Sequence, residues 1–399
     1  FHFAQHLALD AHAIQQMPRE RIDKMLAILT ELDDPHTSGY LWLRAYEYHY
    51  QKEVFSALLN KPENHGTPQP SAQFIFCMDD REESVRRHLE EIAPDIETFG
   101  AAGVFGLPNN WRALDAPRPL KLAQPVVTAV HELREVPTPA AQAYLPTYLR
   151  RLRWVNALRR VQNHRMRHDV LYALLSLPVL APWALLDLLG RSLMPATYQR
   201  WLNRWQQRSK RKLPTRVQYT AQEPLACPSA EHNQLGWSFT EKVEKVAAFL
   251  KLTGFTRNFA PLVVLMAHRS RHLNNPHILG YGCGACSGRF GGPNARAFAS
   301  MANEAAVREQ LAKQHNIIIP DSCWFTAAEH DTTSDDVDWL DTELIPPTHQ
   351  QIFQQVQQAS VQAAQLSAQE RCRKFASARV VALPTINAPA RRTRSSKAG

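Results

Sequence analysis

Two short apolar runs constrain the fold of this chain more than any other feature. Residues 73–76 (QFIF) and 261–267 (PLVVLMA) contain almost no polar side chain. Such runs are typical of parallel β-strands that are covered by helices on both faces. The first run leads into residues 82–92, where apolar side chains recur at helical spacing. Because a strand followed at once by a helix is a βα unit, we predict an α/β fold with flanking helices.

The rest of the pattern places further elements around these strands. Helices are predicted over residues 20–32, 41–59 and 295–315 and from 348 to about 375, and short strands over 316–319 and 324–326. With 399 residues, 44% of them hydrophobic, the chain can bury a sizeable core in one large or two smaller domains. We divide it into a first half of an α/β domain, a basic and apolar helical insertion, a second half of the α/β domain and a disordered basic tail: 1–145, 146–215, 216–380 and 381–399.

Polar side chains follow the first strand at alternate positions. Cys77, Asp79 and Arg81 come directly after the apolar run and before the predicted helix. In extended backbone, alternate side chains point to the same side, and the carboxyl ends of strands are where α/β sheets place their ligands. The three residues alone are more typical of a buried cysteine beside a surface ion pair than of a functional site.

A second polar cluster follows the other strand. His268 ends that run, and Cys283 comes after it in a loop rich in glycine. Two thiolates and an imidazole suit zinc, and a catalytic zinc keeps its fourth position for water or a displaceable ligand. Asp79 could close this shell, whereas Arg81 could hold the Asp79 carboxylate away through a two-pronged pair. We therefore predict a Zn²⁺ site at Cys77, His268 and Cys283, at which Asp79 and Arg81 form a gate: Asp79 either fills the fourth position or, held by Arg81, leaves it open for water.

Other chemistry remains open for the neighbouring polar residues. Cys283 and Cys286 could be a redox pair, although Cys286 is better interpreted as packing within the loop. His272 and His277 could shuttle protons, but solvated loop histidines are more common. The acidic stretch 329–335 is interpreted first as a polar loop and second as a group of residues behind the metal ligands.

Positive charge and apolar character are concentrated in the middle of the chain. Residues 150–167 contain seven arginines, and an uncharged segment, 170–186, follows with Pro178 and Pro182 inside it. Two prolines four apart should interrupt a helix, so we do not expect the segment to span a membrane. It is either a buried helical hairpin or an element that docks on anionic headgroups or on a membrane-embedded partner. No nucleic-acid-binding motif accompanies the charge, so nucleic acid is not an expected partner.

Six cysteines spread over nearly 300 residues indicate a reducing compartment rather than a disulfide scaffold. No leader with a basic and then an apolar part is visible at the start of the sequence. We therefore place the chain on the cytoplasmic side of the membrane.

The order C-x-D-x-R, a distant histidine and a second cysteine resembles the zinc site of β-type carbonic anhydrases. Longer strings are more specific: FCMDDREESVRRHLEE, ETFGAAGVFG, NNPHILGYGCGAC and EHDTTSDD resemble the DabA family of probable inorganic carbon transporter subunits. The resemblance implies a β-carbonic-anhydrase-like sheet in a peripheral protein on the cytoplasmic face of the cell inner membrane. It also assigns ligand roles to Cys77, Asp79, His268 and Cys283, and a gating role to Arg81.

The same resemblance implies a partner and an activity. The expected partner is DabB, an antiporter-like membrane subunit, and the expected reaction is energy-coupled hydration of CO2 to bicarbonate, with activity expected only within the complex. Family members are considerably longer, so the chain is expected to be a piece of a longer protein. The alternative function is a non-catalytic scaffold, stabilised by zinc, in a membrane ion-transport complex.

Overall fold

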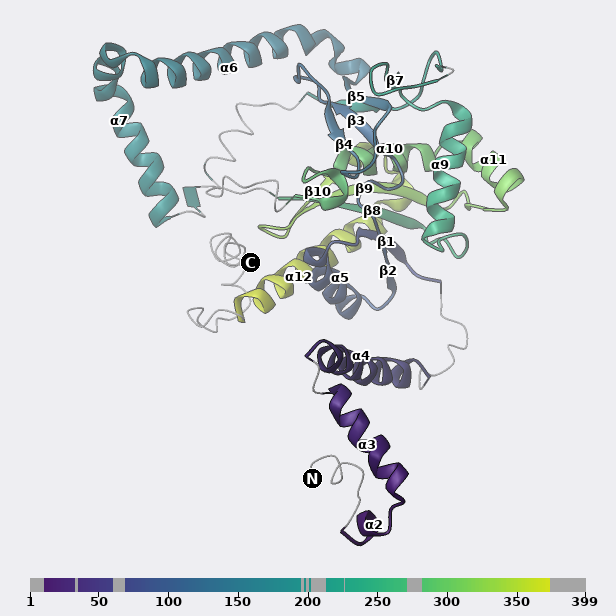
Figure 1. Ribbon diagram of the computed structural model, residues 1–399. Helices are drawn as coiled ribbons and strands as arrows, with labels where there is room; N and C mark the ends of the chain where they lie inside the picture. The colour runs from purple at the N-terminus through teal and green to yellow at the C-terminus, as the bar shows by residue number, and fades with distance from the viewer. Residues whose placement is uncertain are drawn as a thin grey trace. The chain divides into compact units, whose positions relative to one another are not determined.

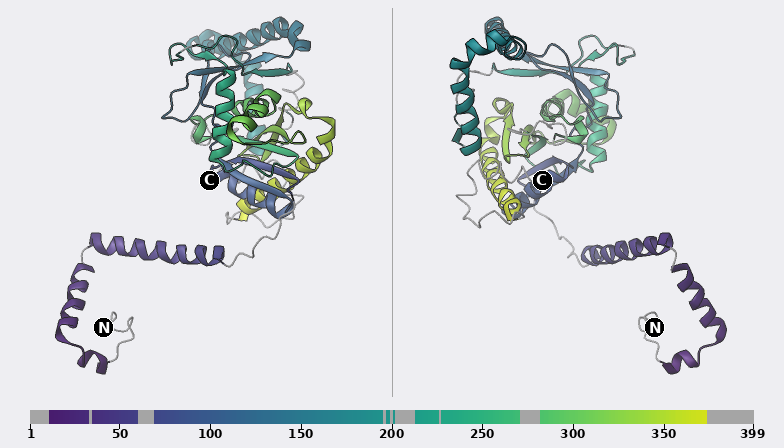
Figure 2. Two further views of the ribbon diagram at one scale, coloured as in Figure 1. Left: turned by 90° about the vertical axis from the view of Figure 1, so that its right-hand side faces the viewer. Right: turned by 60° about the vertical axis from the view of Figure 1, so that its left-hand side comes forward.

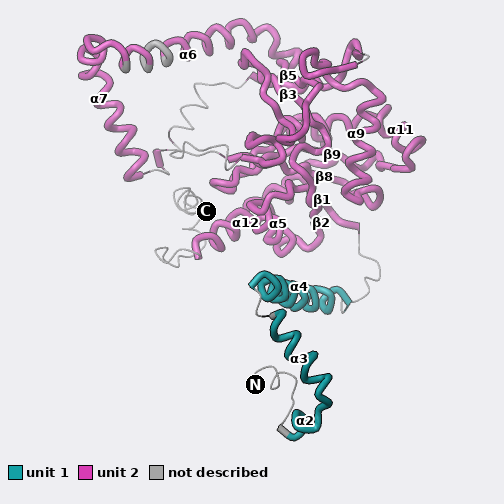
Figure 3. Tube along the Cα trace, viewed as in Figure 1, with its two compact units in different colours: residues 1–67 teal, residues 68–399 magenta. Residues whose placement is uncertain are grey.

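The computed structural model describes most of the chain, namely residues 11–32, 35–59, 69–194, 197–198, 201, 213–225, 227–270 and 282–373. His272, His277 and the predicted basic tail lie outside the described residues. The chain forms two compact units, residues 1–67 and 68–399 (Figure 3).

The first unit is helical. It contains α2 (Ala11–Gln15), α3 (Arg19–Leu32) and α4 (Pro35–Leu59) (Figure 1). The helices predicted over 20–32 and 41–59 are confirmed, and α4 begins earlier than predicted. No described residue of α4 is buried, so the apolar side chains that predicted this helix lie on its exposed surface.

The second unit is built on a five-stranded sheet in the order β10–β9–β8–β1–β2. Its strands are β1 (Ala72–Cys77), β2 (Ile96–Ala101), β8 (Leu262–Arg269), β9 (Trp324–Asp331) and β10 (Asp336–Leu340). All neighbours are parallel except β10, which runs antiparallel to β9. Parallel strands joined through helices confirm the predicted α/β class.

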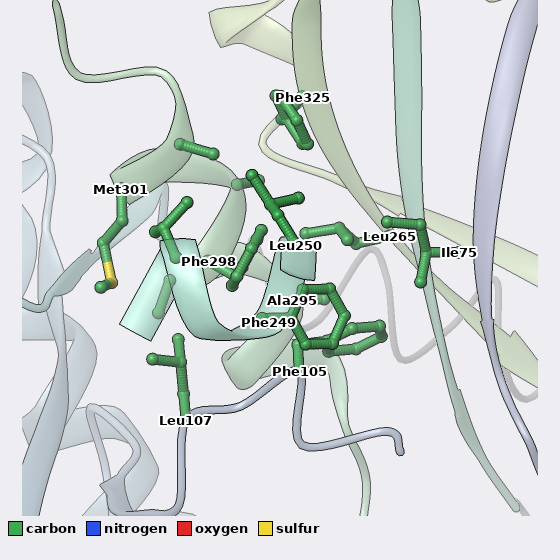
Figure 4. Close-up of a cluster of buried hydrophobic side chains, with 14 of the residues drawn as sticks. Ile75, Phe105, Leu107, Phe249, Leu250, Leu265, Ala295, Phe298, Met301 and Phe325 are labelled. Carbon is green, nitrogen blue, oxygen red and sulfur yellow. The ribbon is translucent and has the colours of Figure 1, made fainter. Parts of the chain in front are cut away.

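Helices cover both faces of this sheet (Figure 2). On one face, α5 (Asp80–Ile92) and α12 (Gln350–Arg373) pack on alternate side chains of the central strands, such as Phe74 and Val264. On the other face, α9 (Phe239–Leu252), α10 (Gly292–Ala302) and α11 (Ala305–His315) pack against the opposite set. Figure 4 shows this second cluster, in which Ile75 and Leu265 face Phe249 and Phe298. The sheet is therefore buried on both faces, as its apolar runs predict.

A second, smaller sheet has the strand order β4–β3–β5–β6, with β7 also paired to β5. Its strands are β3 (Asn109–Arg112), β4 (Leu120–Leu122), β5 (His131–Pro137), β6 (Thr215–Gln218) and β7 (Gln234–Leu235). β5 and β6 are antiparallel neighbours, and α6 (Leu145–His168) and α7 (Val170–Leu193) lie between them in the sequence. Two helices thus lie in the sequence between two paired strands; the division into an α/β domain with a helical insertion at 146–215 stays a prediction.

Helix α7 differs from the prediction. It runs without interruption through Pro178 and Pro182. Prolines four apart lie on one helix face, so the hydrogen bonds are lost on that side only, and Ser176 Oγ donates to the carbonyl of Ala173 at 3.1 Å. None of its residues is buried, so the prediction of a buried hairpin is wrong. Among the described helices, α7 is the one whose length and composition would allow it to cross a membrane; the prediction that it does not span stays a prediction.

Two further elements were predicted wrongly, and a third was predicted too short. The helix predicted over 295–315 is two helices, because the chain turns between Ala302 and Ala305. Residues 316–319 are not a strand, because Asn316 adopts a left-handed conformation (φ 53°) at the end of α11. β9 extends to Asp331, well beyond the predicted end at 326, and its last residues are buried and polar.

Candidate metal centre

Two neighbouring strands and one loop bring three sulfur and nitrogen ligands together. Cys77 is the last residue of β1, and His268 lies near the end of β8, the parallel neighbour of β1. Cys283 enters from the loop that precedes α10 and pairs by backbone with Arg289. Because parallel strands end at the same edge of a sheet, residues about two hundred positions apart meet there.

The three side chains form a compact and fully enclosed group. Their ligand atoms all lie within 4.8 Å of one another, and the two sulfurs of Cys77 and Cys283 are 3.8 Å apart. That separation is far longer than a disulfide bond of about 2.05 Å, and both cysteines are free. His268 is fully buried, and neither of its ring nitrogens makes a hydrogen bond to another residue in the described part of the chain. A buried imidazole whose nitrogens are not hydrogen-bonded, beside two thiols, is a group that could hold a metal ion.

The thiols do not ionise readily without a cation. The neighbouring thiol of Cys283 and the burial of the site both raise the pKa of Cys77 above its ordinary range. A metal ion binds the thiolate form, so binding at this group would release protons.

Gly103 packs directly on the two sulfurs. A Cβ atom at this position would lie 2.8 Å from Cys283 Sγ and 2.9 Å from Cys77 Sγ. The backbone of this segment therefore forms one wall of the thiol pair, a close approach that only glycine allows. The Cys286 thiol donates to the carbonyl of Gly103 at 3.5 Å and is fully buried, so Cys286 packs within the loop and against the same backbone segment as the two sulfurs.

Asp79 and Arg81 form a closed pair at the start of α5. Asp79 is the N-cap, and its Oδ1 accepts from the backbone N–H of Arg81 at 3.1 Å and from Arg81 Nε at 2.7 Å. A third bond joins the Arg81 guanidinium to Oδ2 at 2.6 Å. Burial favours the protonated carboxyl, but the bonds from Arg81 outweigh it and hold the pKa of Asp79 at about 2. The Asp79 carboxylate is thus ionised, and both of its oxygens accept hydrogen bonds from Arg81.

This pair lies beside the other three residues. Asp79 Oδ2 is 3.6 Å from His268 Nε2, and Arg81 also donates to the carbonyl of Gly282 at 3.0 Å, next to Cys283. The predicted alternation is correct for Cys77 and Asp79 only. Arg81 lies inside α5, which begins at Asp80 rather than at 82, and it reaches back to Asp79 from the first helical turn.

A second group of ionisable residues lies behind His268 and was missed by the sequence analysis. Glu82 is 1% exposed and lies 4.0 Å from His268 Nδ1, measured from Oε1. The same carboxylate contacts His330 Nδ1 at 2.8 and 3.0 Å. The sequence spacing could have predicted that Glu82 is buried, because Glu82 lies three residues before Val85 and seven before Leu89 and so shares the buried face of α5.

The acidic residues of β9 belong to the same buried group of ionisable side chains behind His268. Glu329 and Asp331 lie on either side of His330 in the strand and are buried. Arg269 donates to Glu329 at 2.7 Å and also pairs with Asp338. The interpretation of this stretch as a polar loop is wrong for residues 329–331, which belong to β9 and are buried, whereas residues 332–335 form the turn that leads to β10.

The fold and this site define an α/β protein whose sheet edge carries a buried Cys–His–Cys group able to hold a metal ion. A sequence model of the family described as "Probable inorganic carbon transporter subunit DabA" matches residues 2–397. The chain belongs to this DabA family. The protein of that name from Methylococcus capsulatus is 44% identical over 405 residues, which cover 99% of this chain and 36% of that protein. Its namesake from Nitrosococcus oceani is 41% identical over 394 residues, 95% of this chain and 34% of that protein.

The chain therefore spans about a third of the length of these relatives. No solved structure matches it.

Proposed function

We propose that this chain forms the zinc centre of a subunit of an energy-coupled inorganic carbon pump that hydrates CO2 to bicarbonate. The observation that carries the proposal is the enclosed Cys77–His268–Cys283 group with an ionised carboxylate held beside it by an arginine. The names of the relatives, probable inorganic carbon transporter subunits, give the substrate class.

The donor set and its dimensions support zinc. Two sulfurs bound to one tetrahedral zinc at about 2.3 Å lie about 3.8 Å apart, which matches the 3.8 Å between Cys77 and Cys283. His268 supplies a ring nitrogen that makes no hydrogen bond to any residue the structure describes. Soft sulfur ligands with an imidazole favour zinc over magnesium, calcium or manganese.

In the proposed mechanism, Cys77, His268 and Cys283 hold the ion, and Arg81 keeps Asp79 from becoming the fourth ligand. When bound at such a three-ligand site, zinc lowers the pKa of water to about 7 and so supplies a nucleophile for CO2 at neutral pH. Arg81 makes three hydrogen bonds to Asp79, so the carboxylate is ionised yet unavailable to the metal. The burial of the three ligands excludes bulk water from their side of the site.

Uptake in one direction requires that the contact between Asp79 and Arg81 be controlled. A reversible hydratase alone cannot accumulate bicarbonate beyond equilibrium, because it accelerates both directions equally. If Asp79 alternates between Arg81 and the metal, a partner that binds one arrangement better shifts the population toward it. We assign this role to the membrane subunit DabB, which couples the change to ion flow.

The proposed location is the cytoplasmic face of the inner membrane, as a peripheral subunit. Helix α7 exposes large apolar side chains along its length, among them Val170, Leu175 and Trp183. The arginine-rich helix α6 precedes it. An exposed apolar helix next to positive charge suits a membrane surface with anionic headgroups.

Growth complementation tests the activity. The complete subunit is expressed with its membrane partner in a host that lacks other carbonic anhydrases and grows only in air enriched in CO2. Wild type should restore growth in ambient air, and Cys77→Ala and Asp79→Ala should not. Asp80→Ala is the matched control, because Asp80 is the next carboxylate in the chain and is exposed. Growth supported by Cys77→Ala and Asp79→Ala would contradict the proposal.

The scaffold alternative makes a different prediction for Arg81. A purely structural zinc does not require a guanidinium that holds Asp79 off the metal. Under the scaffold function, Arg81→Ala should leave growth unchanged. Under the enzymatic function it should abolish growth while the protein still contains zinc, because Asp79 is then free to close the coordination shell.

A further inference from the structure

Glu82 is a buried carboxylate placed between two buried histidines. It projects from the first turn of α5, while His268 and His330 are register partners on the neighbouring strands β8 and β9. Its carboxylate contacts His330 Nδ1 at 2.8 and 3.0 Å and lies 4.0 Å from His268 Nδ1. Burying a charged group that is only 1% exposed costs folding free energy unless neighbouring groups compensate the charge. The position of Glu82 therefore requires an explanation.

The compensation that Glu82 receives is incomplete. His330 Nε2 lies 3.3 Å from Asp335, and Asp335 pairs in turn with Arg371 at the end of α12. Asp335 thus has a permanent cation of its own. Among the residues that the structure describes, the carboxylate of Glu82 has ion-pair contacts with two imidazoles, those of His330 and His268.

The two ring nitrogens of His268 face opposite partners. Nε2 lies 3.6 Å from Asp79, on the side of the gating pair, and Nδ1 lies 4.0 Å from Glu82. Neither nitrogen has a hydrogen bond within the described protein. A neutral imidazole that binds a metal through one nitrogen carries its proton on the other, and a carboxylate on that side fixes the ring and increases its basicity.

We infer that Glu82 is a positioning residue for the metal centre: it faces Nδ1 of His268, directs Nε2 toward the metal, and strengthens metal binding with its buried negative charge. His330 and Asp335 hold Glu82 in place from the far side. The inference rests on the proposed metal site and adds a role for a residue outside the ligand set.

The competing explanation is that Glu82 serves only as the partner of His330 in a buried ion pair. Glu82→Gln distinguishes the two explanations, because glutamine keeps the size of the side chain and an acceptor for His330 but removes the negative charge. Glu83→Gln is the matched control, since Glu83 is the neighbouring glutamate and its side chain is 62% exposed in a pair with Arg87. Asp335→Asn is the second variant, because it disturbs His330 while leaving the charge of Glu82 intact.

The measurement is Zn²⁺ affinity of the 399-residue chain by competition with a chromophoric chelator. Removing a carboxylate behind a metal-binding histidine typically weakens binding about 10- to 100-fold, and we expect that loss in Glu82→Gln. Glu83→Gln should bind like wild type, and Asp335→Asn should lose less than about threefold. In the Co²⁺-substituted protein, the visible d–d bands should shift in Glu82→Gln and not in Glu83→Gln.

Two results would overturn the inference by itself: wild-type Zn²⁺ affinity in Glu82→Gln, or an equal loss in Asp335→Asn. The second result would mean that damage to the buried network, rather than the missing charge, weakens binding. A wild-type chain that binds no Zn²⁺ would overturn the proposed function and this inference together. The two failures are therefore distinguishable in one set of titrations.

Discussion

Replacing Gly103 by alanine should disable the proposed metal centre without replacing any of the proposed ligands. The added Cβ would lie 2.8 Å from Cys283 Sγ and 2.9 Å from Cys77 Sγ, whereas ordinary contact begins at 3.4 Å. The sulfurs or the backbone must therefore move by about half an ångström, and metal–ligand distances tolerate only about 0.2 Å. We expect Gly103→Ala to weaken Zn²⁺ affinity by about tenfold or more. Overpacking should also lower the free energy of unfolding by about 1–3 kcal/mol.

Gly284→Ala is the control for this substitution. Gly284 directly follows Cys283, and a Cβ there would meet no atom within 4 Å. Zn²⁺ affinity is measured by chelator competition and stability by urea denaturation of both variants and wild type. If Gly103→Ala binds Zn²⁺ like wild type and Gly284→Ala, the sulfurs are not held against this backbone and the close packing described above is wrong.

Two further predictions concern the scaffold and the membrane. Ser238→Ala removes the side-chain part of the capping box of α9, because the Ser238 hydroxyl accepts from Glu241 N–H and donates to the Glu241 carboxylate, while the backbone N–H of residue 238 still donates to that carboxylate. The loss should cost about 1 kcal/mol of unfolding free energy. Burial opposes ionisation of Glu241, but the bonds from Ser238 hold its pKa at about 2, below the usual 4.5; this stabilisation is complete above pH 4.5 and is lost as the pH falls toward 2. The difference between wild type and Ser238→Ala in urea denaturation should therefore shrink between pH 5 and pH 3, and a constant difference would contradict this assignment. Leu175→Glu and Leu185→Glu, which place charge on the exposed apolar surface of α7, should reduce co-flotation with vesicles containing phosphatidylglycerol. Val126→Glu, at a side chain that is 94% exposed elsewhere, should float like wild type, and unchanged flotation of both leucine variants would rule out α7 as the membrane contact.

The sequence alone was sufficient to predict that Cys77, His268 and Cys283 lie together, because the strands that end near Cys77 and His268 are easy to recognise as apolar runs. Apolar runs that end at Cys77 and His268 predict strands buried on both faces, and the carboxyl ends of such strands meet at one edge. Cys283 follows from the glycine-rich loop. The structure places all three side chains in one buried group.

The sequence could not predict which polar residues are buried, because their burial depends on contacts with charged residues that are distant in the sequence. The end of β9 is polar, and contacts such as those of His330 with Glu82 and of Glu329 with Arg269 make its burial possible. A pattern of apolar residues cannot reveal such pairs, because the partners are far apart in the sequence. Glu82 was missed for the same reason, and the continuity of α7 was missed because prolines on one face interrupt a helix less than prolines spread around it.

Metal analysis tests the central claim most directly. The purified chain should contain one zinc per molecule, and His268→Ala should lose it, because the variant leaves two thiols of raised pKa without the imidazole. The measurement is elemental analysis after dialysis against a weak chelator, with circular dichroism to confirm folding. Zinc absent from wild type, or retained at one per molecule in folded His268→Ala, would contradict a zinc centre at Cys77, His268 and Cys283.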